Sequence, residues 1–275
     1  MSGSRRPLKS LGQNFLVDHN IINGIIRTAS IKPDQAVLEI GPGRGALTEH
    51  LAERAGQLVL IEFDHALAAW HREKYRSNPG VSVIDGDILK VDLEKIMPIR
   101  PQGWNVVANL PYNISTEVLF RLLPLHDRLD RMTLMLQKEV GARLTASPDC
   151  SEYGVTSVLL GLWFTIRRAF IVSPGCFHPR PKIDSAVLSF VPLSEPRAEV
   201  GHEELFRQIV KAAFAMRRKT LFNCLKSADC TKNIDLYAML EASGIDGQRR
   251  GETLSLDEFA RLSRWLSEST PVNLP

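Results

Sequence analysis

The first 193 residues alternate short runs of β-branched and aliphatic residues with longer helical patterns, and this alternation constrains the fold more than any other feature. Strands that alternate with helices along a chain indicate a mostly parallel sheet with helices on both faces. Strands are expected at residues 36–40, 58–61, 81–84, 104–108, 132–136, 166–172 and 185–191, and helices at 46–54 and 65–75. The last strand alternates apolar and polar residues, which suits a hairpin at the edge of the sheet. We therefore predict an α/β fold around a sheet of seven strands.

A change of composition near Pro192 divides the chain. Residues 192–200 carry two prolines and mixed charge, as expected of a linker, and the pattern beyond them is helical. Helices are expected at 203–215, 219–226, 236–243 and 256–266, the last of them capped by Ser255. We therefore expect an α/β domain at residues 1–193 and a small all-helical domain at residues 194–275.

Composition excludes several classes of protein. With 44% hydrophobic and 24% charged residues, the chain is typical of globular rather than disordered proteins. A net charge of only +3 predicts that any surface for nucleic acid is a local patch. The longest apolar run, 157–166, is too short for a membrane span, and the N-terminus lacks the apolar run of a secretion signal. The four cysteines lack metal-binding spacing, so we expect reduced thiols of a cytoplasmic protein and no metal site.

A glycine-rich loop follows the strand expected at 36–40 and opens the next helix. It reads Gly41-Pro42-Gly43-Arg44-Gly45. Glycines let a backbone approach a ligand closely, and a helix N-terminus offers free N–H donors. The spacing matches neither the dinucleotide fingerprint nor the Walker lysine loop, so the loop taken alone also fits a simple tight turn.

Acidic residues stand at the carboxyl ends of three successive strands, at Glu39, Glu62 and Asp87. An acid at the position of Glu62 can accept hydrogen bonds from both hydroxyls of a ribose, and Asp87 is placed to meet the amino group of an adenine. Each residue alone is more often a helix cap or a solvated loop residue. Because the three stand in register along one edge of the sheet, together they indicate a nucleoside ligand.

The fourth strand ends in Asn109-Leu110-Pro111-Tyr112. The side-chain oxygen of Asn109 and the carbonyl of Leu110 can both accept hydrogen bonds from an exocyclic amino group, and Tyr112 can stack on a base. A turn closed by Pro111 with a tyrosine in the core explains the same four residues. Combined with the glycine loop and the three acids, however, they indicate a site for an amino-bearing base.

At this point the sequence resembles the ribosomal RNA adenine N6,N6-dimethyltransferase family, and within it the small-subunit enzymes. The resemblance rests on six segments in order, at residues 11–16, 39–45, 109–115, 177–185, 215–221 and 254–259. It implies a Rossmann-like class I methyltransferase sheet, mostly parallel with an antiparallel edge hairpin, followed by helices. It also implies methyl transfer from S-adenosyl-L-methionine to N6 of two adjacent adenosines near the 3′ end of small-subunit (16S) ribosomal RNA.

The resemblance assigns roles to residues of this chain. The cofactor site would comprise Gln13, Asn14, Leu16, Glu39, Gly41, Gly43, Gly45, Glu62, Asp87, Ile88 and Asn109. The catalytic residues would be Asn109, Leu110, Pro111, Tyr112 and Phe177. Phe177 would stack on the flipped target base opposite Tyr112, although an isolated phenylalanine before two prolines is more often a core residue. No metal is expected.

Basic clusters would hold the RNA, at Arg5, Arg6, Lys9, Arg217, Arg218 and Lys219. Residues 200–232 carry seven Lys or Arg against three Asp or Glu, a pattern that also fits a solvated helix face. The expected partner is small-subunit ribosomal RNA within a precursor of the small ribosomal subunit, bound by a monomer that contacts no membrane.

Three positions depart from the family pattern, Glu152, Val155 and Arg180, and leave the RNA contacts around them open. Large-subunit adenine methylases remain an alternative, although Leu110 and the helical tail favour the small-subunit type. A non-catalytic RNA-binding assembly factor is a second alternative, against which the intact Asn109 argues. A nicotinamide oxidoreductase is a third, and the glycine spacing argues against it.

Overall fold

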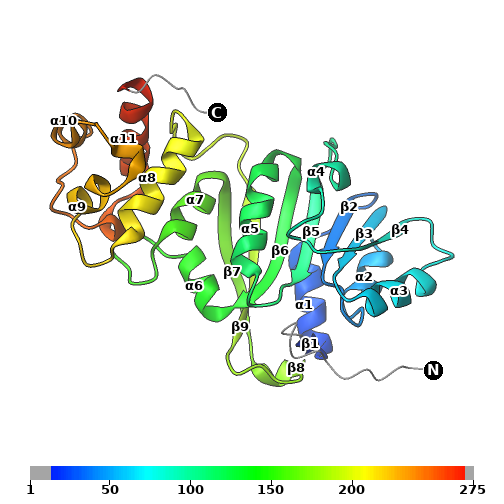
Figure 1. Cartoon of the computed structure of the whole chain (residues 1–275). Helices are drawn as coiled ribbons and strands as arrows, with labels where there is room; N and C mark the ends of the chain where they lie inside the picture. The colour runs from blue at the N-terminus through cyan, green and yellow to red at the C-terminus, as the bar shows by residue number, and fades with distance from the viewer. Residues whose placement is uncertain (1–13, 270–275) are drawn as a thin grey trace. The chain divides into compact units, whose positions relative to one another are not determined.

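The computed structural model describes residues 14–269, and the chain forms two compact units (Figure 1). The first unit comprises residues up to Gly141 together with Thr165–Pro192, and the second comprises Ala142–Phe164 together with the chain from Leu193 onward. Residues 142–164, which the sequence assigned to the α/β domain, therefore belong to the second unit. The reason is the apolar helix α7 (Val155–Trp163), which packs on helices of the C-terminal segment.

A seven-stranded sheet forms the centre of the first unit, in the order β4–β3–β2–β5–β6–β9–β7. Its strands are β2 (Ala36–Ile40), β3 (Gln57–Glu62), β4 (Val81–Asp85), β5 (Trp104–Asn109), β6 (Leu129–Gln137), β7 (Phe164–Val172) and β9 (Ser185–Pro192). Strands β2 to β6 pair in parallel, and β9 pairs antiparallel with β6. The seven predicted strands and the mostly parallel sheet are confirmed. The strand with alternating apolar and polar residues, β9, lies between β6 and β7, and β7 forms the edge of the sheet.

The helices of the first unit connect these strands. They are α1 (His19–Ala29), α2 (Thr48–Ala52), α3 (His65–Lys74), α4 (Leu93–Ile96) and α5 (Ser115–Leu122), with short 3-10 turns η2 (Leu123–Arg128) and η3 (Pro174–Cys176). Strands β2 and β5 at the centre are buried along nearly their whole length, as expected for a parallel sheet covered on both faces. Helix α1, which the sequence did not predict, is capped by Asp18, whose carboxylate accepts hydrogen bonds from the backbone N–H groups of Asn20 and Ile21.

A second, two-stranded sheet joins distant parts of the first unit. Strand β1 (Phe15–Leu16) pairs antiparallel with β8 (Phe177–His178), so that Leu16 stands opposite Phe177. Neither strand was predicted. This pairing brings the start of the described chain next to the segment 177–185.

The second unit is helical. Its helices are α7, α8 (Glu203–Ala215), α9 (Leu221–Lys226), α10 (Leu236–Ala242) and α11 (Leu256–Ser269), with 3-10 turns η4 (Asp229–Thr231) and η5 (Gly251–Thr253), and α6 (Lys138–Leu144) carries the chain into this unit. The predicted cap of α11 is confirmed, because Ser255 Oγ accepts from the backbone N–H of Glu258 at 3.2 Å and the Glu258 carboxylate accepts from that of Ser255 at 2.8 Å. No helix between residues 14 and 269 is long and apolar enough to cross a membrane.

Candidate functional site

A pocket of about 300 Å³ opens at the carboxyl ends of the parallel strands β2, β3, β4 and β5, within the first unit. This is the edge at which α/β sheets bind their ligands, and the volume is at the lower end of the range for small-molecule sites. The predicted residues that line it are Asn14, Leu16, Glu39, Gly41, Gly43, Glu62, Asp87, Ile88, Asn109, Leu110, Pro111 and Tyr112. Gly45 and Phe177 do not line it, and Gln13 lies outside the described residues. The structure thus brings together segments that are up to 98 residues apart, from Asn14 to Tyr112.

The glycine loop is held in one conformation by its neighbours. Gly43 has a φ of +56°, and a Cβ at this position would lie 3.1 Å from a ring carbon of Phe15. The Gly43 N–H donates to Glu62 Oε2 at 2.9 Å, and the Gly43 carbonyl lies 3.0 Å from Nε2 of His71. A side chain at position 43 would be strained and crowded, so a glycine is required there.

Glu62 is oriented by the backbone on two sides. Its Oε2 accepts from Gly43, and its Oε1 accepts from the N–H of Asp64 at 2.9 Å. Burial raises the pKa of this carboxyl, and the two backbone hydrogen bonds oppose the rise. Each carboxylate oxygen can accept more than one hydrogen bond, so Glu62 retains the capacity to accept from a diol.

Glu39 is the most deeply buried acid of the pocket. It is 2% exposed, and its Oε2 has no hydrogen-bond partner among the described residues. Burial raises its pKa to about 8, and the negative charge of Glu62 contributes to the rise. A carboxyl with this pKa is largely protonated at neutral pH, and a ligand with a positively charged donor group would favour its ionised form, in which both oxygens accept.

The next wall of the pocket follows β4. Asp87 Oδ1 accepts from the backbone N–H of Leu89 at 2.9 Å, which fixes the turn that carries it, and the buried Ile88 supplies an apolar surface. Phe63 also lines the pocket and is 54% exposed. Phe63 was not predicted, although an aromatic residue directly after the acid that ends β3 is a signal for such a position.

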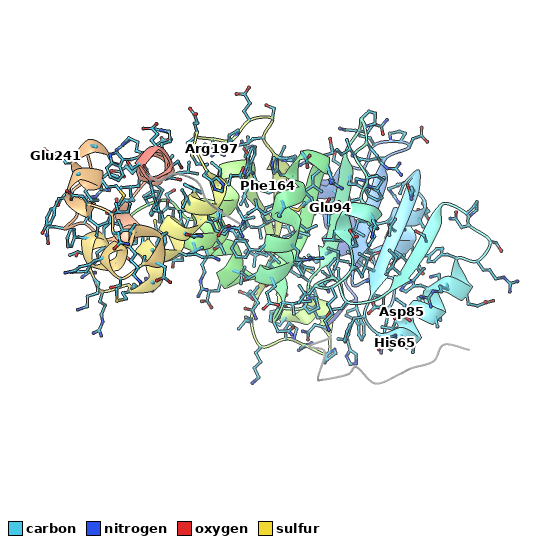
Figure 2. The ribbon with its side chains drawn as sticks, turned by 45° about the horizontal axis from the view of Figure 1, so that its top comes forward. His65, Asp85, Glu94, Phe164, Arg197 and Glu241 are labelled. Carbon is cyan, nitrogen blue, oxygen red and sulfur yellow. The ribbon has the colours of Figure 1, made fainter. Side chains whose placement is uncertain are left out.

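One further acid at this edge of the sheet does not belong to the pocket. Asp85 pairs with Glu62 in the register of β3 and β4, but its Oδ1 lies 2.5 Å from Nδ1 of His65 (Figure 2). Its Oδ2 lies 3.8 Å from a guanidinium nitrogen of Arg72. An acid at a strand end is therefore no proof of a ligand contact, and tertiary partners decide which acids face the pocket.

Asn109 ends β5, and its side chain is held by the N-terminal segment. Its Nδ2 donates to the backbone carbonyl of Asn14 at 3.1 Å. Because a carbonyl only accepts, this bond determines which end of the amide is the nitrogen and leaves Oδ1 as the end that can accept from a ligand. The following residue, Leu110, is 1% exposed, and its N–H donates to the carbonyl of Met135 at 3.2 Å. The backbone after Asn109 is thereby anchored to the core.

Tyr112 is half-buried in the pocket wall, and its hydroxyl lies 2.6 Å from Oγ of Ser185. Burial raises the pKa of Tyr112, and the hydrogen bond to Ser185 opposes the rise. Tyr112 belongs to the segment 109–115 and Ser185 to the segment 177–185, so this contact joins two of the six segments on which the family resemblance rests.

Phe177 differs from its predicted placement. It is 2% exposed and lies in a hydrophobic cluster with Leu16, Met135 and Val187 instead of facing a base beside Tyr112. The cause is the β1–β8 pairing, which covers this residue with the N-terminal segment. Phe177 is therefore a core residue in this structure, as the alternative interpretation of the sequence expected.

Three of the predicted RNA-binding residues are described, and Arg5, Arg6 and Lys9 lie outside the described residues. Arg217, Arg218 and Lys219 are exposed between α8 and α9 in the second unit. Arg217 donates to the carbonyl of Ser151 at 2.8 Å and lies 3.5 Å from a carboxylate oxygen of Glu252. This contact sets the loop around residue 151 directly beside the basic cluster. Between residues 14 and 269, no group of three or more His, Cys, Asp or Glu side chains is arranged to hold a metal ion.

Residues 6–268 match the model of the family described as ribosomal RNA adenine dimethylase. Proteins called ribosomal RNA small subunit methyltransferase A are similar along nearly the whole chain. That of Geobacter metallireducens is 53% identical over 94% of this chain and 95% of its own, and that of Geobacter sulfurreducens is 54% identical over 95% of each.

Solved structures agree on the fold. A dimethyladenosine transferase from Plasmodium falciparum superimposes with a TM-score of 0.77 at 24% identity, over 92% of this chain and 98% of its own. The 23S rRNA methyltransferase ErmE superimposes with a TM-score of 0.67 at 28% identity, over 92% of this chain and 99% of its own. The predicted fold class, a Rossmann-like methyltransferase sheet followed by helices, is confirmed.

Proposed function

The chain belongs to the ribosomal RNA adenine dimethylase family, and we propose that it transfers methyl groups from S-adenosyl-L-methionine to small-subunit (16S) ribosomal RNA. The acceptors are N6 atoms of two adjacent adenosines near the 3′ end, and the product is N6,N6-dimethyladenosine. The observation that carries this proposal is the amide of Asn109, held by Asn14 in the wall of a pocket that is otherwise suited to a nucleoside.

The residues of the pocket fit S-adenosyl-L-methionine. The unpartnered oxygen of Glu39 and the adjoining glycine loop suit its polar methionine half, where an ammonium group supplies donors. Glu62 suits the ribose hydroxyls, and Asp87 with Phe63 suits the adenine. When bound, this donor supplies a methyl group on a positively charged sulfur, which needs no metal for its activation.

The task left to the protein is to prepare the acceptor nitrogen, whose lone pair is delocalised into the adenine ring. Asn109 Oδ1 and the Leu110 carbonyl accept the N6 hydrogens, favour a pyramidal nitrogen and stabilise the positive charge that develops on it. The same contacts orient the nitrogen for in-line attack. The methylated nitrogen is acidic enough to lose its proton afterwards, so no general base is required before transfer.

An amide rather than a carboxylate at position 109 suits dimethylation. After the first transfer only one N6 hydrogen remains, so the site cannot depend on two hydrogen bonds to the acceptor. The structure supplies a second reason, since Asn109 uses its Nδ2 to reach Asn14 and an aspartate would have no proton for that contact.

The target base must leave its RNA context to enter the pocket. Tyr112 lines the pocket and can stack on the base, which contributes about 1–3 kcal/mol for a base on an aromatic side chain. Phe177 is covered in this structure, so we assign the stacking to Tyr112. Arg217, Arg218 and Lys219 are proposed to contact the RNA backbone, in a cytoplasmic monomer that acts on a precursor of the small subunit.

The large-subunit activity is the competing proposal. ErmE, at 28% identity, is named as a 23S rRNA methyltransferase, whereas the Geobacter relatives at 53% and 54% identity are named as small-subunit methyltransferases. The much higher identity to the latter supports the small subunit.

The decisive experiment incubates the protein with labelled S-adenosyl-L-methionine and either unmethylated small ribosomal subunits or naked 16S and 23S rRNA, followed by mapping of the labelled nucleotides. We expect label on two adjacent adenosines of 16S rRNA. Label confined to 23S rRNA would support the competing proposal, and no transfer to any of these RNAs would contradict both.

A further inference from the structure

His71 on α3 has no assigned role, yet it contacts the glycine loop directly. The imidazole is 0% exposed and is not among the residues that line the pocket. Its Nε2 lies 3.0 Å from the carbonyl oxygen of Gly43. It therefore touches the loop and cannot touch a ligand in the pocket.

The chemistry of this contact determines the state of the ring. A carbonyl oxygen only accepts, so Nε2 must carry the proton and donate it. Nδ1 is buried without a hydrogen-bond partner among the described residues, which fits an unprotonated nitrogen. Burial lowers the pKa of His71 and the bond to Gly43 opposes this, so burial favours the neutral ring.

Aromatic neighbours hold the imidazole in place. The ring of Trp70 packs against it edge-on at 4.7 Å between centroids, and the ring of Tyr75 stacks parallel to it at 6.2 Å. These contacts hold the plane of the imidazole, and the bond from Nε2 to the carbonyl of Gly43 selects the edge of the ring that faces the loop.

The contact matters because the loop has little intrinsic order. Gly41, Gly43 and Gly45 all have positive φ, and a glycine-rich backbone loses much conformational entropy when it is ordered. The residue at the centre of the loop is tied at both ends, since the Gly43 N–H bonds to Glu62 and its carbonyl bonds to His71. Order that exists before binding strengthens the binding of a ligand.

We propose that His71 is a positioning residue for the methyl donor: it holds the carbonyl of Gly43 and so orders the glycine loop before the donor binds. This inference rests on the proposed function, because it takes the loop to be the contact surface of S-adenosyl-L-methionine. The competing explanation is that His71 merely fills the core beneath the loop.

Two substitutions separate these explanations. His71→Phe keeps a ring of similar size and removes the donor, whereas His71→Gln gives up some packing and keeps an N–H at the end of the side chain. The control is Tyr75→Phe, which removes a buried hydroxyl without a hydrogen-bond partner among the described residues and keeps the stacked ring. Binding of S-adenosylhomocysteine is measured by calorimetry for each protein, together with the melting temperature and the KM and kcat for methyl transfer.

For a positioning residue, His71→Phe raises the Kd for S-adenosylhomocysteine and the KM for the donor about tenfold, the equivalent of one net hydrogen bond. The kcat at saturating donor stays within about twofold, because His71 does not touch the reacting groups. His71→Gln restores most of the affinity, and Tyr75→Phe binds as the wild type does. If His71→Phe binds as tightly as the wild type, or if both His71 variants lose affinity only in proportion to their melting temperature, the proposal is wrong.

A measurement on the unmodified protein tests the same contact without relying on a variant that folds. Nitrogen-15 spectra of the imidazole should show the proton of His71 on Nε2. A proton on Nδ1 would overturn the proposal, since a bare Nε2 cannot donate to Gly43. Failure of the wild type to bind S-adenosylhomocysteine would instead refute the proposed function, so the two failures are distinguishable.

Discussion

The substitution Asn109→Asp tests whether the amide acts through its nitrogen as well as its oxygen. The change is isosteric and keeps an acceptor for the N6 hydrogens of adenine. It removes the Nδ2 donor that reaches the carbonyl of Asn14 at 3.1 Å and sets a carboxylate oxygen against that carbonyl. If only the acceptor mattered, the variant would remain active.

The magnitude follows from the lost contact. Removal of the donor leaves the opposing carbonyl of Asn14 without a partner, which costs about 1–3 kcal/mol. A carboxylate can relieve this cost only by rotating its oxygens away from Asn14 and out of position for N6. With about 2 kcal/mol as the effect, kcat/KM should fall about thirtyfold.

The assay is labelled methyl transfer to unmethylated small subunits, with S-adenosylhomocysteine binding measured in parallel. Asn109→Asp should bind this product within a few fold of the wild type, and Asn109→Ala, which lacks the acceptor too, should abolish transfer. Asn20→Asp, exposed on α1 and outside the pocket lining, controls for the added negative charge. Wild-type kcat/KM in Asn109→Asp, or an equal loss in Asn20→Asp, would refute the role of the Asn14 contact.

Gly43→Ala should weaken S-adenosylhomocysteine binding about tenfold in calorimetry. The new methyl meets the ring of Phe15, and a positive φ costs about 1–2 kcal/mol for a non-glycine residue. Unchanged binding would show that the loop is not the contact surface of the ligand. Glu39 has a folded-state pKa of about 8 against 4.5 in the unfolded chain, so its contribution to stability is full below pH 4.5 and is lost as the pH rises to 8. Glu39→Gln should therefore flatten the fall in melting temperature between these pH values, and an identical pH profile in the variant would contradict the assignment. The double charge reversal Arg217→Glu and Arg218→Glu should weaken RNA binding and make the affinity less dependent on salt, because two phosphate contacts are lost. Filter binding at several salt concentrations measures both effects. A wild-type affinity that does not change with salt would contradict a surface that contacts phosphates.

Much of the ligand-binding edge was predictable from local patterns. Glu39, Glu62 and Asp87 each follow a run of strand-forming residues, and the carboxyl ends of parallel strands meet at one edge of a sheet. The glycine loop and Asn109 follow strands in the same way. Their meeting in one pocket is therefore a consequence of topology, which the alternation of strands and helices already indicated.

Contacts between distant segments were not predictable in this way. Asp85 and Asp87 are both acids near the end of β4, and only the packing of His65 and Arg72 directs Asp85 away from the pocket. The resemblance assigns Phe177 to the target base, but the pairing of β8 with β1 buries it. The assignment of residues 142–164 to the second unit likewise depends on which helices the apolar face of α7 meets.

The amino-acid sequence by itself determined the seven strands of the main sheet, the glycine turn and the line of acids, because each depends on residues close together in the chain. The tertiary structure alone decided the orientation of the Asn109 amide, the burial of Phe177 and the contact of His71 with Gly43. These depend on hydrogen bonds and packing between segments 28 or more residues apart, whose register no local pattern encodes.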